Sequence, residues 1–182
     1  MRLDTPRLHL RPLDRDDVTP TYVGWLNDPA VSRFLESPHD PRTFESVAAF
    51  VEAANGRDDE HLFGIFLNEA ERHIGVIKLG PVHPVHQVGE VSLLIGDREV
   101  WGQGYAAEAI TRLVRHAFED LGLAKLSASL HAANLGSERA FLKAGFEREG
   151  LRHAHYDLDG ARSDVVELGL VSLRPRRRWR LS

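Results

Sequence analysis

The chain has 182 residues, of which 42% are hydrophobic and 27% charged, a composition that is ordinary for one globular domain. Its formal charge is -4, and it contains no cysteine, which excludes disulfides, zinc–thiolate sites and a mechanism through an acyl-cysteine. No apolar stretch has membrane-spanning length and no secretory leader follows Met1, so we expect a cytoplasmic protein with no membrane partner.

The charge is unevenly distributed along the chain. Residues 174–182 contain five arginines and no acid, which leaves 18 basic and 27 acidic side chains, or a formal charge of -9, on residues 1–173. We expect a single domain over residues 1–173 and a basic, solvated tail over residues 174–182. The acidic body favours a cationic small molecule as partner and weakly repels nucleic acid.

The first half of the chain predicts a strand, two helices and a hairpin. Leu8–Leu13 alternates like a strand, and the helix-like stretch after it is interrupted by Pro20 and ends at Asn27–Pro29. Asp40–Pro41 has the composition of a helix start, so a second helix is expected from there to about Asn55. Residues 62–68 and 73–80 predict an antiparallel hairpin, and a loop over 80–87 leads to the next strand.

The second half predicts the longest helix. After a strand over 90–96, apolar residues recur every three or four positions from Ala106 to Leu121, which indicates an amphipathic helix. A strand over 124–131, a short helix from about Leu135 to Ala144 that stops at Gly145, and strands over 146–156 and 164–172 follow. Three consecutive strands before the main helix imply a mixed, largely antiparallel sheet with helices packed on it.

The turn Gly102–Gln103–Gly104, just before the main helix, is typical of a phosphate site. Backbone N–H groups at a helix start have no partner within the helix, the helix dipole makes that end partly positive, and glycines allow close approach. Residues 102–107 also fit the dinucleotide fingerprint, but the next strand ends in Leu130–His131 without the required acid, and too little chain follows for a doubly wound domain. No GKS or GKT occurs, which excludes a P-loop. A plain structural turn remains an alternative.

Three segments together resemble the GNAT superfamily of acyl-CoA-dependent N-acetyltransferases. WGQGYA (residues 101–106) is similar to the family's pyrophosphate loop. NLGSERAFLKAGF (134–146) resembles the later motif of the branch that acetylates ribosomal-protein N-termini, approximately NxxSxRxxxKxGF. WLNDPAVSRFLE (25–36) is similar to a segment of the same branch and of amino-sugar acetyltransferases. Trp101 stands where the family most often has Arg or Gln, which leaves the role of its side chain open.

The resemblance implies a fold and an acyl donor. The fold would be α+β with three layers, in which helices cover both faces of a mixed, largely antiparallel twisted sheet. Acetyl-CoA would be the donor, without a metal, and its pantetheine arm would run beside Leu94, Ile95 and Gly96. Its pyrophosphate would bind the loop made of Trp101, Gly102, Gln103, Gly104, Tyr105 and Ala106. Asn134 would contact the CoA arm, although its residue type equally suits a helix cap.

The resemblance also implies direct transfer of the acetyl group to a primary amine, with both substrates bound together. Glu90, at the start of the central strand, is the candidate general base, acting directly or through a water, and desolvation beside an apolar strand would raise its pKa. The alternative is a strand-edge glutamate that faces solvent. Ser137 would hydrogen-bond or protonate the departing sulfur, where other members use tyrosine.

The acceptor side is the least defined part of the prediction. By analogy it would include Trp25, Asn27, Phe34 and Glu36, with His83 at its border. A protein N-terminus, an amino sugar and an aminoglycoside-like molecule all stay open as acceptors. The closely spaced histidine pairs lack an acidic or cysteine partner at matching spacing, so no metal site is expected. A homodimer and a non-catalytic acyl-CoA-binding module are further alternatives.

Overall fold

The computed structural model describes residues 1–35 and 41–173. The predicted basic tail and Glu36 lie outside these ranges. The described strands are β1 (Leu3–Asp4), β2 (Leu8–Pro12), β3 (His61–Leu67), β4 (His73–His83), β5 (Val88–Ile95), β6 (Lys125–His131), β7 (Glu147–Leu158) and β8 (Ala161–Val171). The helices are α1 (Pro20–Asn27), α2 (Pro29–Ser32), α3 (Phe44–Asn55), α4 (Tyr105–Arg115) and α5 (Leu135–Lys143), with short helical turns η1 (Arg15–Asp17), η2 (Arg98–Val100) and η3 (His116–Asp120).

The strands form one sheet in the order β1-β2-β3-β4-β5-β6-β8-β7. Within the described ranges every neighbouring pair is antiparallel except β5 and β6, which run parallel. The parallel pair exists because α4 carries the chain back across the sheet between the two strands, as a parallel connection requires. The predicted mixed, largely antiparallel sheet is confirmed.

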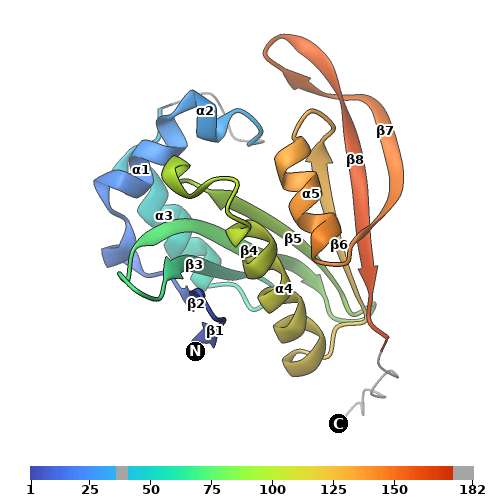
Figure 1. Cartoon of the computed structure of the whole chain (residues 1–182), viewed down its shortest axis with the longest axis horizontal. Coiled ribbons are helices and arrows are strands. Elements are labelled where there is room, and N and C mark those ends of the chain that lie inside the picture. The colour runs from blue at the N-terminus through green and yellow to red at the C-terminus, as the bar shows by residue number, and fades with distance from the viewer. Residues whose placement is uncertain (36–40, 174–182) are drawn as a thin grey trace.

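Helices cover both faces of this sheet (Figure 1). On one face Ile110 and Leu113 of α4 and Phe141 of α5 are fully buried against β-strand residues of the larger core. On the other face Val47 and Val51 of α3 pack with Tyr22 of α1 in a second, smaller core. The three-layer α+β architecture implied by the sequence is confirmed.

Two local predictions differ from the structure near the N-terminus. Pro20 does not interrupt a helix but begins α1, where its missing N–H costs nothing, and Thr19 caps the helix by accepting from Tyr22 N at 3.2 Å. The helix expected from Asp40–Pro41 begins at Phe44, because Thr43 and Ser46 form a reciprocal capping box. Asp40 itself lies outside the described residues.

One strand is longer than predicted, and one strand was not predicted. β4 continues to His83, so half of the expected loop over 80–87 is strand, and the two-residue β1 is an addition. The amphipathic helix is confirmed as α4 followed by η3, and Gly145 ends α5 with a φ of 98°. No helix of the described residues is long and apolar enough to cross a membrane.

Candidate active site

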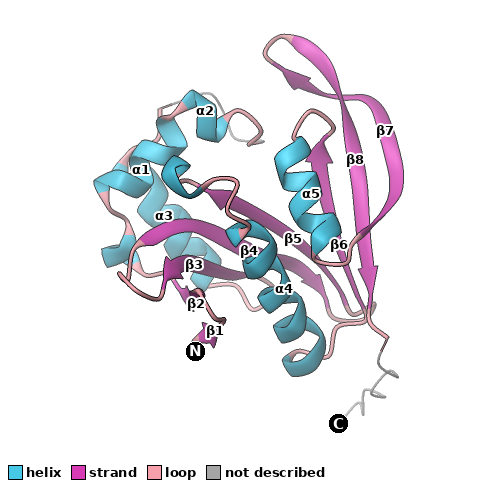
Figure 2. Ribbon diagram, in the orientation of Figure 1, coloured by secondary structure: helices cyan, strands magenta, loops and turns pink. Residues whose placement is uncertain are grey.

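The parallel pair β5–β6 is short, and the site lies where it ends. The two strands pair only over Val88–Glu90 and Lys125–Ser127, and they diverge beyond that point (Figure 2). β6 stays paired with β8 along its whole length, while the rest of β5 stays paired with β4. The backbone groups that face the gap therefore lack strand partners there, and a cavity of about 440 Å³ opens beside Glu90.

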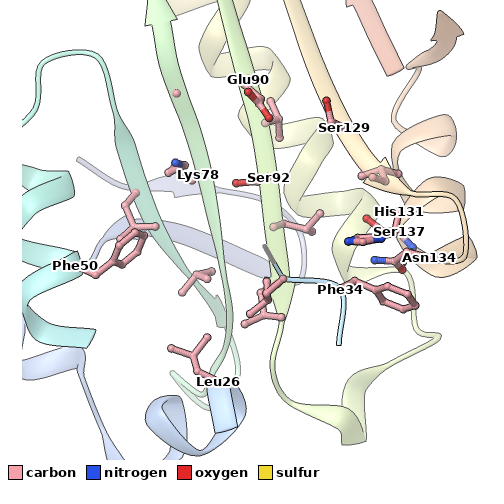
Figure 3. Close-up of a pocket in the computed structure, with 18 of the residues that line it drawn as sticks. Leu26, Phe34, Phe50, Lys78, Glu90, Ser92, Ser129, His131, Asn134 and Ser137 are labelled. Carbon is pink, nitrogen blue, oxygen red and sulfur yellow. Dashed lines mark hydrogen bonds between the residues drawn. The ribbon is translucent and has the colours of Figure 1, made fainter. Parts of the chain in front are cut away.

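Several predicted site residues line this cavity together: Glu90, Leu94, Phe34, Asn134 and Ser137. Figure 3 shows Glu90 on β5 toward one end, with Asn134 and Ser137 across the gap. Glu90 is an exposed residue, whereas its neighbour Val91 is 1% exposed in the core under α4. The cavity is therefore reached by solvent at Glu90, and any desolvation of that carboxylate would come from bound substrates.

The end of β5 offers one backbone amide to the gap. Gly96 N already donates to Ile74 O at 3.0 Å. Because backbone direction alternates along antiparallel strands, the N–H of Ile95 then points away from β4 and toward β6. Gly96 has a separate packing role, since a Cβ at this position would lie 2.1 Å from the ring of Trp25.

The side chain of Trp101 has a defined role, which the sequence left open. Its Nε1 donates to Ile95 O at 2.8 Å, although the residue is 45% exposed. This bond joins the end of β5 to the start of the predicted phosphate loop. An arginine or glutamine could also donate here, so the tryptophan keeps a donor while adding a rigid ring.

The predicted phosphate loop has the geometry that anion binding requires. Gly102 and Gly104 have φ values of 75° and 84°, a region in which a Cβ is strained. Gly104 is the N-cap of α4 and supplies no side-chain cap. Within the described residues, the N–H groups from Gly102 to Ala106 donate to no backbone acceptor. Five amides at a helix start are thus available to a pyrophosphate.

Side chains fix the loop from outside and leave its amides open. Gln103 Nε2 donates to Glu99 O at 3.0 Å, and Arg7 Nη1 donates to Gln103 O at 3.0 Å. Glu108 holds Arg7 by accepting from its Nε at 2.7 Å. Burial raises the pKa of Glu108, but hydrogen bonds from Thr5 and Arg7 outweigh it and hold that pKa below its usual value.

Lys143 adds a positive charge beside the loop. Its Nζ lies 3.8 Å from the position that a Cβ on Gly104 would take. The residue belongs to the motif of residues 134–146, but nothing in the sequence placed it next to residues 101–106. Its charge suits the phosphates of a CoA molecule.

Asn134 and Ser137 are positioned by the start of α5. Asn134 Oδ1 accepts from Ser137 N at 3.2 Å, so the residue is a helix cap as its type suggested. The cap uses the amide oxygen, while the Nδ2 group of the same side chain has no hydrogen bond among the described residues. Capping and a contact to a ligand in the cavity are therefore compatible.

The residues expected on the acceptor side separate into three groups. Phe34 lines the cavity with Leu26, whereas Trp25 packs on Gly96 and lines a second hollow with Arg72 and His73. Asn27 lines neither hollow, but its side chain hydrogen-bonds the backbone N–H and C=O of Arg42, which lines the cavity. His83 is exposed, its ring centroid lies 4.4 Å from that of His86 at a tilt, and it lines neither hollow.

Several polar residues of the cavity were missed by the sequence reasoning: Lys78, Ser92, Ser129 and His131. A signal existed, because polar residues alternate with apolar ones at Glu90 and Ser92 of β5 and from Lys125 to His131 of β6, which places them on one face of the sheet. His131 is 7% exposed, and its Nδ1 lies 3.2 Å from Ser163 Oγ. Tyr22 also lines the cavity, and burial raises its pKa to about 12, so its hydroxyl stays protonated.

Metal ligands are not assembled anywhere in residues 1–35 and 41–173, where no cluster of three His, Asp or Glu side chains could hold an ion. The donors around the cavity are hydroxyls, amides and single charges, a set suited to an organic substrate.

Comparison with known proteins identifies the family. The sequence profile of the acetyltransferase (GNAT) domain matches residues 7–147. The chain is 31% identical over 117 residues to the probable N-acetyltransferase YjcK of Bacillus subtilis (strain 168), a match covering 64% of each chain. It is 28% identical over 174 residues to the uncharacterized N-acetyltransferase YoaA of the same organism, covering 94% of this chain and 97% of that protein.

Solved structures share the fold at low sequence identity. RimL, a ribosomal L7/L12 alpha-N-protein acetyltransferase in complex with coenzyme A, has a TM-score of 0.84 at 19% identity, covering 94% of this chain and 98% of RimL. Spermidine N-acetyltransferase from Vibrio cholerae, in complex with CoA and spermine, has a TM-score of 0.82 at 21% identity, covering 92% and 96%. With the profile spanning most of the sheet and the predicted phosphate loop, the chain belongs to the GNAT family and is an acetyl-CoA-dependent N-acetyltransferase.

Proposed function

We propose that the enzyme transfers the acetyl group directly to a primary amine in the cavity between β5 and β6, with Glu90 as general base and Ser137 beside the departing sulfur. The observation that carries the proposal is the divergence of the two strands immediately after Glu90 and Ser127. It opens one cavity that joins the carboxylate of Glu90 to the start of α5.

The donor would follow the free backbone of this region. Acetyl-CoA supplies an activated thioester. Its phosphates would meet the amides of residues 102–106 and the charge of Lys143, and its pantetheine arm would pair with the open edge of β5 in the manner of an added strand. The N–H of Ile95 would polarise the thioester oxygen as negative charge develops there.

The chemistry then needs two proton transfers. Glu90, directly or through a water, accepts one proton from the substrate ammonium. The neutral nitrogen attacks the carbonyl carbon, so that a C–N bond forms while the C–S bond breaks. The second nitrogen proton passes to the departing sulfur, to which the Ser137 hydroxyl would donate a hydrogen bond.

Glu90→Gln and Ser137→Ala test these roles. General base catalysis contributes about 10²–10⁴-fold, so Glu90→Gln should lower kcat by at least about 100-fold with unchanged affinity for acetyl-CoA. Ser137→Ala should lower kcat without affecting that affinity. Glu69→Gln, in the exposed turn between β3 and β4, is the matched control and should behave as wild type. Thiol release by Glu90→Gln at the wild-type rate would remove Glu90 from the mechanism.

A further inference from the structure

The cavity carries a charge opposite to that of the surrounding protein. Among the described residues that line it, Arg42 and Lys78 are cationic and Glu90 is the one carboxylate. Residues 1–173 as a whole have a formal charge of -9. A substrate that enters the cavity therefore meets two positive groups, although the negative charge of the protein as a whole attracts cationic molecules.

Lys78 lies close to the proposed reaction centre. It pairs with Ser92 across β4 and β5, and Glu90 is two residues further along β5 (Figure 3). Diagonal neighbours on one face of a sheet are about 7–8 Å apart, which is within the reach of their side chains. Lys78 Nζ lies 3.6 Å from Glu60 Oε1, beyond hydrogen-bond distance, and Glu60 is shared with Arg57 at 3.7 Å. The positive charge of Lys78 is thus only partly compensated.

Arg42 is held in place through its backbone. Asn27 Oδ1 accepts from Arg42 N at 2.8 Å, and Asn27 Nδ2 donates to Arg42 O at 2.8 Å. These two bonds tie the end of α1 to the segment that precedes α3. Arg42 is a partly exposed residue of the cavity wall, and its guanidinium takes part in no hydrogen bond or ion pair with residues 1–35 and 41–173. Asn27 is thus a positioning residue for Arg42.

Apolar side chains complete the wall around these charges. Leu26, Phe34 and Phe50 line the same cavity, and Phe50 is 47% exposed. An exposed aromatic ring at a cavity wall offers contact area to an apolar group of a ligand.

We propose that the acceptor is a small primary amine that also bears a carboxylate and an apolar group, as in an apolar α-amino acid. This inference rests on the proposed function. The ammonium would lie at Glu90, the carboxylate at Lys78 and Arg42, and the apolar group against Phe50 and Leu26. Arginine pairs with carboxylates through two parallel hydrogen bonds, which favours this group over a neutral amide. A polyamine would place a second ammonium against one of two cations.

Thiol release from acetyl-CoA with four matched acceptors tests the inference: L-phenylalanine, L-phenylalaninamide, phenethylamine and spermidine. We expect kcat/KM for L-phenylalanine to exceed that for L-phenylalaninamide by about tenfold or more, as one charge-assisted contact allows. The amide has the less basic amine and so the larger neutral fraction, which means that basicity cannot produce this preference. Spermidine should be the poorest acceptor.

Variants then assign the preference to the two cations. Arg42→Met and Lys78→Met should each reduce kcat/KM for L-phenylalanine by a larger factor than kcat/KM for phenethylamine, which has no carboxylate to contact either cation. Arg115→Met, on an exposed arginine of α4 outside the cavity, is the control. Equal turnover of the acid and the amide, or an equal loss for both amines in the variants, would overturn the inference.

A binding measurement separates this inference from the proposed function. Calorimetric titration of the CoA-loaded enzyme with the same compounds should rank them in the same order. If none of the amines causes thiol release from acetyl-CoA, the proposed transfer is refuted. The order of binding affinities would still decide whether the cavity selects a carboxylate. Turnover of the amide and spermidine ahead of L-phenylalanine would keep the transfer and refute the carboxylate site.

Discussion

Glu108→Gln is the sharpest test of how the predicted phosphate loop is held, because one carboxylate joins three parts of the protein. Glu108 Oε1 accepts from Thr5 Oγ1 at 2.7 Å and from Arg7 N at 3.1 Å, and Oε2 accepts from Arg7 Nε at 2.7 Å. Arg7 in turn bonds Gln103 O and lies 4.3 Å from the centre of the Tyr105 ring. Glutamine keeps the shape but removes the charge and turns one acceptor into a donor that faces donors.

The magnitude follows from burial. The Glu108 side chain is 17% exposed and that of Arg7 is 46% exposed. Hydrogen bonds to charged groups contribute about 1.5–3 kcal/mol each when buried, and solvent on the Arg7 side reduces this, so we expect a loss of about 2 kcal/mol in the free energy of unfolding. For a chain of this size that corresponds to a Tm lower by about 4–8 °C. Loss of one fixing contact on the loop should raise KM for acetyl-CoA about fivefold.

The pH dependence gives the effect a signature. Because the pKa of Glu108 is lowered in the folded protein, its stabilisation is fully present above the ordinary carboxylate pKa and is lost as pH falls through the lowered value. Denaturant unfolding of wild type and Glu108→Gln should therefore differ equally at pH 7 and pH 5, and the difference should shrink below about pH 4.

Glu45→Gln is the matched control, since Glu45 is 75% exposed and pairs with Arg15 on the surface. Such pairs contribute about 0–1 kcal/mol, so this variant should unfold nearly as wild type. If Glu108→Gln is no less stable than Glu45→Gln, or if its deficit persists unchanged at pH 3, the carboxylate does not hold the loop in the way we argue.

Two further predictions concern other parts of the molecule. Gly104→Val should abolish CoA binding, measured by calorimetry. The control Gly122→Val adds the same backbone strain at a φ of 69°, has no atom within 4 Å of its Cβ, and should bind CoA normally. CoA binding by both variants would refute the loop assignment. Burial lowers the pKa of His73 to about 4. Between pH 6.5 and 4 the unfolded chain therefore binds a proton that the folded one does not. As the pH is lowered through this range, the free energy of unfolding should fall by about 1.4 kcal/mol per pH unit. His73→Gln should flatten that slope in denaturant unfolding, and parallel curves would contradict the reasoning.

Elements with a long regular pattern were predictable, and short ones that depend on a distant partner were not. The period of Ala106–Leu121 gave the main helix because its apolar face has one core to cover. β1 has only two residues, and its register against β2, with Leu3 opposite Leu10, is set by pairing rather than by its own sequence. Pro20 was misread because a proline that breaks a helix and a proline that begins one look alike until the cap is known.

The same contrast holds for the site. The predicted phosphate loop is contiguous, so residues 101–106 could be proposed from the chain alone. Lys78, His131 and the backbone clamp on Arg42 come together only through strand register and a bridge from α1. That these residues line one cavity could be seen only once the fold was known.

The net charge of the chain and the lining of the cavity favour different acceptors, and we give more weight to the lining because of distance. Two unit charges about 4 Å apart interact by about 4 kcal/mol at an effective dielectric constant of 20, whereas charges beyond about 8 Å are largely screened at physiological salt. Many surface acids are also already paired, as Asp17 is with Arg11 at 2.6 Å and Asp59 with Arg57 at 2.8 Å. The acidic body can bias which molecules arrive, but the orientation of a bound acceptor depends on the groups that touch it. Among the described residues that line this cavity, those groups are one carboxylate and two cations, which is why we expect an amine with its own negative charge.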